Sequence, residues 1–218
     1  MNSTLFLAEI GIAGGCLCAI ADLFLDLKGS DNKKIGKLKV IDSKWEVMPH
    51  YRFVVSTVLA MFAVPMYCCG VLALSNILAD KSVSFAIAFK AIAIIGAMGG
   101  FMIHTFLNLC PTIYQIVKKD ASFELAEETI NAIFKQIYVP FFTCYTMLVI
   151  IPAGMMIFAI ITGFVEAPLW CVCLNPVVFQ IVGLLLRATK LKCFIDAPSC
   201  CAASLGLASY GLLAIILL

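Results

Sequence analysis

Long apolar segments separated by shorter polar connections dominate the pattern of this chain. The segments run to about 20 residues, which matches the roughly 30 Å of hydrocarbon that a membrane-spanning helix must cross. Reading the apolar runs against the polar, Gly and Pro residues between them predicts six transmembrane helices. Their approximate ranges are 5–25, 53–74, 85–110, 139–164, 169–186 and 199–217. The predicted fold is therefore all-α, a six-helix transmembrane bundle that forms one integral membrane domain over residues 1–218.

Basic residues are concentrated in three of the predicted connections. Thirteen of the fifteen Lys and Arg residues fall there, seven of them between Lys28 and Arg52, whereas only Lys81 and Lys90 fall towards the other side. Cytosolic loops of membrane proteins carry an excess of Lys and Arg. We therefore expect these three loops to be cytosolic and both termini to be non-cytosolic, with the chain integral to the cell membrane.

The connection between the third and fourth spans predicts a short amphipathic helix at about 122–135, on the cytosolic surface. Ser122 is suited to cap its start, and acidic residues follow in the first turns. Apolar residues gather on one helical face, as in helices that lie at a membrane surface. Packing against the bundle and lipid sensing are both compatible with this pattern.

Proline and glycine positions suggest two or three helical-hairpin repeats. Pro49, Pro140 and Pro198 each fall at the start of an even-numbered span, where a missing N–H is tolerated. Residues 11–15 and 96–100 share the pattern Gly-x-x-Gly-Gly. Common descent explains this arrangement, and so does chance in a Gly-rich membrane protein.

Composition supports the membrane interpretation and narrows the chemistry. The chain is 63% hydrophobic and 13% charged, with a mean hydropathy of +1.06, whereas soluble domains are about half apolar and about a quarter charged. A net charge of +2 does not suggest nucleic-acid binding. Most of the eleven Cys residues lie in apolar segments, where a free Cys behaves as a small hydrophobe. Two His residues cannot form a three-His centre. Asp22 and Asp26 with His104 could hold one divalent ion, but nothing in the spacing requires it, so we predict no metal and no cofactor.

Two helix faces place ionisable side chains inside the predicted membrane. The face of the first span and the face of the third span both combine glycines with polar residues: Gly11, Gly15, Asp22 and Asp26; Gly96, Gly100, His104 and Asn108. If the glycine faces pack together, Asp22 lies level with His104 and Asn108, in the cytosolic half of the bilayer. An unpaired carboxylate there costs several kcal/mol. Asp22 and His104 are therefore our candidate catalytic pair, and a purely structural ion pair is the alternative.

The segment before the second span is the densest polar and aromatic stretch. It contains Trp45, His50 and Arg52, and Arg suits recognition of an anionic head group. One interpretation has these residues close a substrate pocket with Asp22 and His104, helped by Asp26 and Asn108. The other makes Trp45 and Tyr51 interfacial anchors and Arg52 a residue whose charge extends to the membrane surface.

Several short motifs, taken together, are characteristic of a known sequence family. They are Trp45-x-x-Met48-Pro49-x-x-Arg52, Pro65-x-Tyr67-x-x-Gly70, Gly100-x-x-x-His104 and Pro168-x-Trp170-x-x-x-x-Asn175-Pro176. With these motifs the chain resembles an uncharacterised family of small bacterial polytopic integral membrane proteins. The resemblance covers most of the chain and implies that the Arg52 and His104 segments belong together. It implies no particular activity.

Three functional hypotheses follow from these residues. The first is an intramembrane enzyme that acts on a lipid-like or amphipathic substrate at the cytosolic leaflet, with Asp22 and His104 as acid and base. The second is a small proton-coupled transporter that uses the same pair as titrating groups. The third is a non-catalytic membrane subunit or regulator. All three predict the lipid bilayer as the surrounding partner, and the first adds a lipid-like small molecule.

Overall fold

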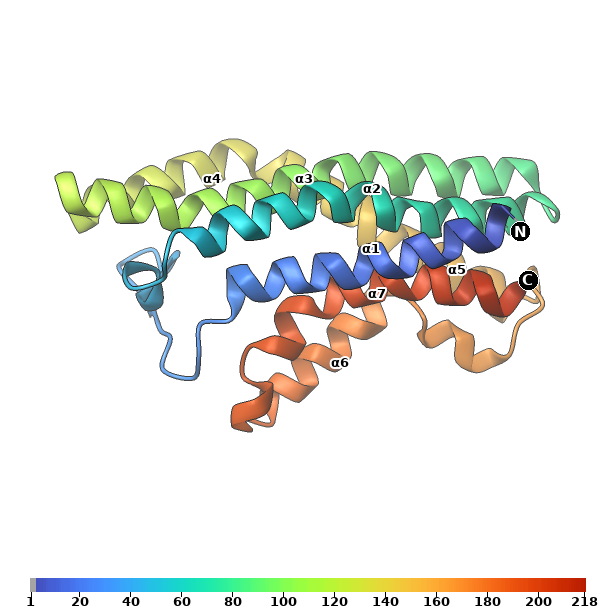
Figure 1. Ribbon diagram of the computed structural model, residues 1–218. Coiled ribbons are helices and arrows are strands. Elements are labelled where there is room, and N and C mark those ends of the chain that lie inside the picture. The colour runs from blue at the N-terminus through green and yellow to red at the C-terminus, as the bar shows by residue number, and fades with distance from the viewer. Residues whose placement is uncertain (1–2) are drawn as a thin grey trace.

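The computed structural model describes residues 3–218, most of which are helical (Figure 1). The α-helices are α1 (Ser3–Asp26), α2 (Tyr51–Ala79), α3 (Val83–Asp120), α4 (Phe123–Tyr145), α5 (Ile151–Ile161), α6 (Pro176–Ala188) and α7 (Ala197–Leu217). A π-helix, η2 (Thr146–Ile150), joins α4 to α5 without a break. The short elements are strands β1 (Lys34–Ile35) and β2 (Ile41–Asp42) and the 3₁₀ turns η1 (Ser43–Glu46), η3 (Leu169–Cys173) and η4 (Lys192–Phe194). With α4, η2 and α5 counted as one helix, residues 3–218 form six helices, which confirms the all-α, six-helix fold.

Five of the helices are long and apolar enough to cross a membrane, which indicates an integral membrane protein. They are α1, α2, α3, the continuous α4–α5 helix and α7. The sixth, α6, has 13 residues and a length of about 20 Å, less than the roughly 30 Å hydrocarbon core. It is shorter than the expected span at 169–186 because Asn175 begins a new helix. The Asn175 side chain accepts hydrogen bonds from the Val177 and Val178 N–H groups.

The fourth span begins earlier than the sequence pattern indicates. Residues 122–135, expected as a separate surface helix, form the first part of α4, and Pro140 lies inside that helix rather than at its start. Membrane helices tolerate an internal Pro because neighbouring groups and local helix adjustments satisfy the freed carbonyl. Ser122 does cap the helix, accepting a hydrogen bond of 3.1 Å from the Leu125 N–H.

One end of the bundle carries the lysine-rich connection 27–50 and the turn between α3 and α4 (Figure 1). We call it the basic end. The 38 residues of α3 extend for about 57 Å, so α3 and the first half of α4 project beyond the other helices as an antiparallel hairpin. Both ends of the described chain lie at the opposite end of the bundle (Figure 1).

Glycines set the packing of α1, but not against the helix we expected. A Cβ added at Gly11 would overlap the backbone of Gly70 in α2, and one at Gly15 would overlap the backbone of Ala208 in α7. Gly96 of α3 packs in the same way on Leu148 in η2. The two glycine faces therefore do not meet each other, because each is taken up by a different neighbour.

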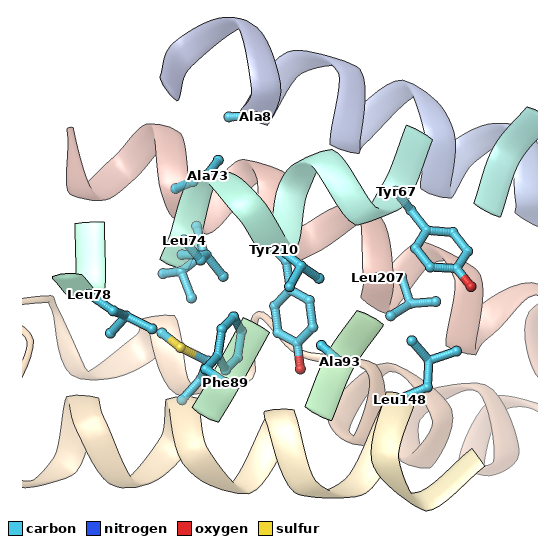
Figure 2. Close-up of a cluster of buried hydrophobic side chains, with 14 of the residues drawn as sticks. Ala8, Tyr67, Ala73, Leu74, Leu78, Phe89, Ala93, Leu148, Leu207 and Tyr210 are labelled. Atoms are coloured by element: carbon cyan, nitrogen blue, oxygen red, sulfur yellow. The ribbon is translucent and has the colours of Figure 1, made fainter. Parts of the chain in front are cut away.

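A second hydrophobic cluster, around Trp45 and Tyr114, lies at the basic end, and the larger cluster fills the half of the bundle that holds the chain ends. Its largest fully buried side chains come from α2, α3 and α7, among them Leu74, Phe89 and Tyr210 (Figure 2). The rings of Phe89 and Tyr210 meet edge to face, with centroids 6.0 Å apart. Large aromatic side chains contribute much of the apolar burial in such a core, and they leave the polar cluster described below nearer the basic end.

The connection 27–50 folds back onto the projecting α3–α4 hairpin. The Glu127 carboxylate of α4 accepts hydrogen bonds from the Lys37 and Leu38 N–H groups, at 3.1 and 2.8 Å. The Gln115 amide of α3 donates to the carbonyls of Trp45 and Met48, at 2.6 and 2.8 Å. These contacts hold the β1–β2 ribbon and η1 as an ordered cover over the basic end.

Candidate functional site

Asp22 of α1 and His104 of α3 form a buried polar pair. The Asp22 Oδ1 and His104 Nδ1 atoms are 3.4 Å apart, and 17% and 9% of the two side chains are exposed. The second carboxylate oxygen of Asp22 accepts a hydrogen bond of 2.6 Å from the Ser204 hydroxyl of α7. The expected proximity of Asp22 and His104 is confirmed, and α7 supplies a third partner that the sequence did not indicate.

The far side of the His104 ring rests on Ser56 of α2. The Ser56 hydroxyl donates to the Ala21 carbonyl at 2.7 Å and lies 2.8 Å from His104 Nε2. Asn108 donates from its amide both to Ser56 Oγ, at 3.2 Å, and to the His104 carbonyl, at 3.0 Å. A hydroxyl has one proton and two lone pairs. Because that proton goes to Ala21, Ser56 accepts from Nε2, and His104 Nε2 carries a hydrogen.

This arrangement leaves His104 Nδ1 facing Asp22, and a hydrogen bond between the two requires one proton. The proton sits either on Nδ1, giving an imidazolium and a carboxylate, or on Asp22, giving two neutral groups. The order Asp–His–Ser resembles a hydrolytic triad in connectivity only. Ser56 is 0% exposed and its proton is committed to Ala21, so it orients the ring and does not act as a nucleophile.

The pair borders a cavity of about 210 Å³ that is lined by residues of α1, α2, α3, α6 and α7 and of the α4–η2 junction. Tyr67 lines it with a hydroxyl that has no hydrogen-bond partner among residues 3–218. Gly100 makes room for that hydroxyl, because a Cβ there would lie 2.7 Å from it. On the opposite wall the Tyr145 hydroxyl donates to Gln180 Oε1 at 2.6 Å, directly before the π-helix η2. Single-turn π-helices are frequent at functional sites.

Arg52 does not join this cluster. Its guanidinium donates to the carbonyls of Leu23, Phe24 and Leu27, at 3.3, 2.9 and 2.8 Å. Leu23 and Phe24 lie in the last turn of α1 and Leu27 directly follows it, where backbone carbonyls lack a full set of partners within the helix. The expectation that Arg52 closes a pocket with Asp22 and His104 is corrected: the side chain reaches the end of α1 first and caps it.

His50 also lies apart from the pair. Its Nδ1 is 3.4 Å from the Thr112 hydroxyl, and it borders a shallow, mainly apolar groove between α2 and α3. Asn108 borders the same groove and reaches the pair only through Ser56 and the His104 carbonyl. The groove and the 210 Å³ cavity are on different sides of α3.

Asp26 and Trp45 lie at a second cavity, of about 410 Å³, at the basic end. Asp26 lines both cavities, as do Leu25 and Leu107, so the two spaces adjoin. Trp45 is 7% exposed and packs on Tyr114, with ring centroids 6.2 Å apart. These two predicted binding residues are thus near the pair, but in the wall of a larger neighbouring space.

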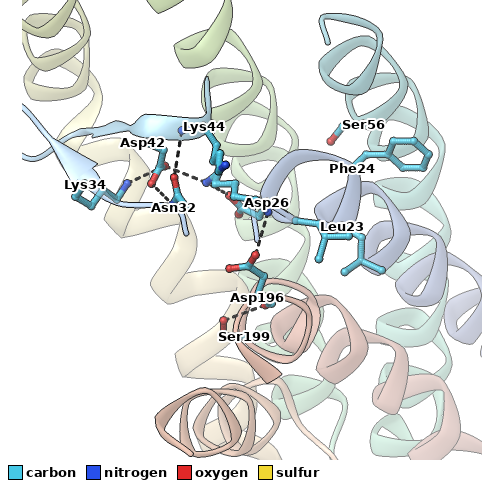
Figure 3. Close-up of polar contacts among 12 residues, drawn as sticks. Leu23, Phe24, Asp26, Asn32, Lys34, Asp42, Lys44, Ser56, Asp196 and Ser199 are labelled. Atoms are coloured by element: carbon cyan, nitrogen blue, oxygen red, sulfur yellow. Dashed lines mark hydrogen bonds and ion pairs between the residues drawn. The ribbon is translucent and has the colours of Figure 1, made fainter. Parts of the chain in front are cut away.

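Buried charge organises this second cavity around Asp42. Lys28 and Lys34 each bind Asp42 Oδ2 at 3.0 Å, and Asn32 donates to Oδ1 at 2.8 Å (Figure 3). Burial opposes ionisation of Asp42, but the lysines and Asn32 outweigh it and hold the pKa of Asp42 below its usual range. Burial likewise opposes the charge on Lys28, and Asp26 with Asp42 outweighs it and raises the Lys28 pKa.

Sequence reasoning did not predict several residues of this site. Ser56, Ser204 and Gln180 are polar side chains inside apolar segments, the same signal that singled out Asp22 and His104. Their hydroxyl and amide groups are less costly in lipid than charges, so the signal was weaker. Among the described residues, no three or more His, Cys, Asp or Glu side chains are placed to hold a metal ion.

Comparison with known proteins adds a family but no activity. No curated protein and no solved structure matches the chain. The profile of one family matches residues 1–218, the whole of the sequence. The chain therefore belongs to the family of unknown function DUF6796.

Proposed function

We propose that this protein is an intramembrane enzyme that performs acid–base chemistry on an amphipathic substrate. The observation that carries the proposal is the Asp22–His104 pair, whose carboxylate and imidazole lie 3.4 Å apart at the wall of a cavity. Buried ionisable residues in membrane segments are costly and are usually functional. A positioned acid–base group contributes about 10²–10⁴-fold to a rate.

Each polar group around the pair has a role in this proposal. Asp22 and His104 Nδ1 give and take the proton, while Ser56 and Asn108 hold the ring and its tautomer. The Tyr67 hydroxyl supplies a donor on the same cavity wall. Asp26 and Trp45 contact the substrate from the adjoining cavity. Arg52 and His50 have no part in it, because neither borders these two spaces.

The substrate enters from the basic end. Both cavities share Leu25, Asp26 and Leu107 on that side, whereas apolar side chains such as Val64, Val149 and Leu207 line the inner cavity. Cytosolic loops hold the excess of Lys and Arg, so the basic end is cytosolic and both termini are non-cytosolic. The enzyme then works in the cytosolic leaflet of the cell membrane.

The test is a lipid-conversion assay on the purified chain in nanodiscs. The discs contain phosphatidylcholine with phosphatidylglycerol, phosphatidic acid and a polyprenyl phosphate, and mass spectrometry follows each species with time. We expect one species to be converted, and Asp22→Asn and His104→Gln to slow this at least 100-fold while the thermal unfolding midpoint stays close to that of the wild type. Asp80→Asn, at an exposed carboxylate at the other end of α2, should leave the rate unchanged.

Three outcomes count against the enzyme. Equal turnover in the Asp22 and His104 variants would remove the pair from the chemistry. Proton or solute flux in proteoliposomes that depends on both residues, without any chemical conversion, would identify a carrier instead. If both substitutions only lower the unfolding midpoint, the pair serves to join α1 to α3.

A further inference from the structure

The larger cavity at the basic end has two chemically distinct walls. Its volume is about 410 Å³, within the range of roughly 300–1,000 Å³ that is typical of small-molecule sites. One wall comes from the connection 27–50 and holds Lys28, Lys34, Lys39, Asp42 and Trp45. The other comes from the α3–α4 hairpin and is apolar: Phe106, Leu107, Cys110, Ile130 and Phe134.

The polar wall has an excess of positive charge. Three lysines and two aspartates line the cavity, Asp26 being the second. Lys28 binds both Asp26 and Asp42, and Lys34 shares Asp42 while 55% of its side chain stays exposed. Lys39 has no ion-pair partner among the described residues. One positive charge therefore remains uncompensated in the lining, and it belongs to Lys39, an exposed residue at the edge of the cavity.

The backbone at Lys39 is unusual for a side chain of this kind. Its φ is +56°, in the left-handed region that non-Gly residues seldom adopt. A Gly would adopt this conformation without strain, as Gly36 does in the same ribbon turn, with φ of +82°. Strained residues that persist in a structure often have a functional reason. Here the strained position presents a cation to the cavity.

The apolar wall and the position of the cavity in the fold indicate which class of ligand it can bind. The cavity lies where α1 ends and the connection 27–50 begins, and its apolar wall lies inside the candidate membrane spans of α3 and α4. A cationic rim above an apolar wall at this depth suits an amphipathic anion, with its charge at the lysines and its chain along α3 and α4. A soluble phosphate would use only the polar half.

We propose that this cavity binds a lipid whose head group carries a phosphate. The phosphate lies against Lys34 and Lys39, beside the Trp45 ring, and an acyl or prenyl chain lies against Phe106 and Phe134. The cavity adjoins the Asp22–His104 space through Leu25 and Asp26, so the bound lipid can be the substrate. This last step rests on the proposed function. The binding itself does not depend on turnover.

Quenching of Trp45 fluorescence by brominated lipid tests the proposal. The chain has two Trp residues, so Trp170→Phe leaves Trp45 as the only one. Trp170 is 57% exposed, on η3. Nanodiscs of phosphatidylcholine contain the same small fraction of either brominated phosphatidic acid or brominated phosphatidylcholine. We expect the brominated phosphatidic acid to quench Trp45 selectively.

Lysine variants locate the head group. Lys34→Gln and Lys39→Gln should each weaken this selective quenching about fivefold, as loss of one lysine near an anionic lipid implies. Lys37→Gln is the matched control, because Lys37 is on the same ribbon but does not line the cavity. Lys39→Gly also removes the cation and relieves the backbone strain, so it should weaken binding without lowering the unfolding midpoint.

The outcomes separate this inference from the proposed function. Asp22→Asn and His104→Gln should keep the selective quenching. Selective quenching in a wild-type chain that converts no lipid would leave the inference standing and remove the enzyme. Equal quenching by the two brominated lipids overturns the inference, as does unchanged selectivity in Lys34→Gln and Lys39→Gln together. Full protection of Trp45 by inorganic phosphate alone would reassign the polar wall to a soluble anion.

Discussion

His104 Nε2 lies 2.8 Å from Ser56 Oγ, and this contact decides how the intramembrane pair can react. Ser56 gives its only proton to the Ala21 carbonyl, so the imidazole must donate to it. The tautomer is thereby set from the side away from the cavity, and Nδ1 is left for Asp22. A contact of this kind orients a reactive ring much as a second partner orients a metal-bound or catalytic histidine.

Ser56→Ala should remove the contact that fixes the His104 tautomer and should also lower the stability of the fold. It leaves the Ala21 carbonyl and His104 Nε2 without their partner in a buried site, which costs about 1–3 kcal/mol in the free energy of unfolding. In the His50→Gln background one histidine remains, and ¹⁵N NMR of that side chain reports which nitrogen carries hydrogen. We expect hydrogen on Nε2 in the parent and a changed nitrogen spectrum in Ser56→Ala. A parent spectrum with hydrogen on Nδ1 alone would contradict the assignment.

Gly15→Ala should destabilise the bundle although it adds only one methyl group. The new Cβ would overlap the backbone of Ala208 in α7, and overpacking of this kind costs about 1–3 kcal/mol. Gly154→Ala makes the same change in α5 where nothing lies within 4 Å of the new Cβ. Its unfolding midpoint in detergent should equal or exceed that of the wild type. Equal midpoints for both variants would mean that α1 and α7 can separate freely.

The equal depth of Asp22 and His104 could be predicted from the sequence. Both residues lie on helices that start at the same end of the bundle, and a helix rises about 1.5 Å per residue. Counting from the helix start therefore places both near one level. The sequence period also shows which residues share a face, but it does not show which neighbour that face meets. This is why the glycines of α1 and α3 were expected to pack together, whereas they contact α2, α7 and η2.

The contacts of Arg52 and the shortness of the sixth helix were harder to predict from the sequence, for different reasons. The connection 27–50 folds back and places Arg52 beside the end of α1, where backbone carbonyls compete for its donors before any distant site does. The run 169–186 is apolar throughout, so hydropathy alone cannot distinguish one span from a turn followed by a 13-residue helix. Only the cap formed by Asn175 settles it. The lysine-lined cavity was hidden because its walls come from segments far apart in the chain.

Arg52→Ala should act on stability rather than on the cavity. The substitution removes three hydrogen bonds to carbonyls at the end of α1, and we expect the free energy of unfolding to fall by about 2 kcal/mol. Arg52→Lys keeps the charge but cannot reproduce the planar set of donors, so it should recover only part of this. Denaturant titration in mixed micelles measures both. Selective lipid quenching that fails in Arg52→Lys at full stability would return Arg52 to the binding site.

Asp42→Asn should change how stability depends on pH. The folded pKa of Asp42 is lowered, so the folded chain binds this proton less readily than the unfolded chain. Its contribution is then complete above the unfolded pKa of about 3.9 and is lost as pH falls through the lower folded value. We expect wild-type stability to decline below about pH 4, and Asp42→Asn to be about 1–3 kcal/mol less stable at neutral pH with a weaker acid decline. Asp120→Asn, at the exposed end of α3, is the control. Unfolding curves at several pH values in one detergent measure this pH dependence. If wild type and Asp42→Asn lost stability in parallel at acid pH, Asp42 would not be the group that causes the loss.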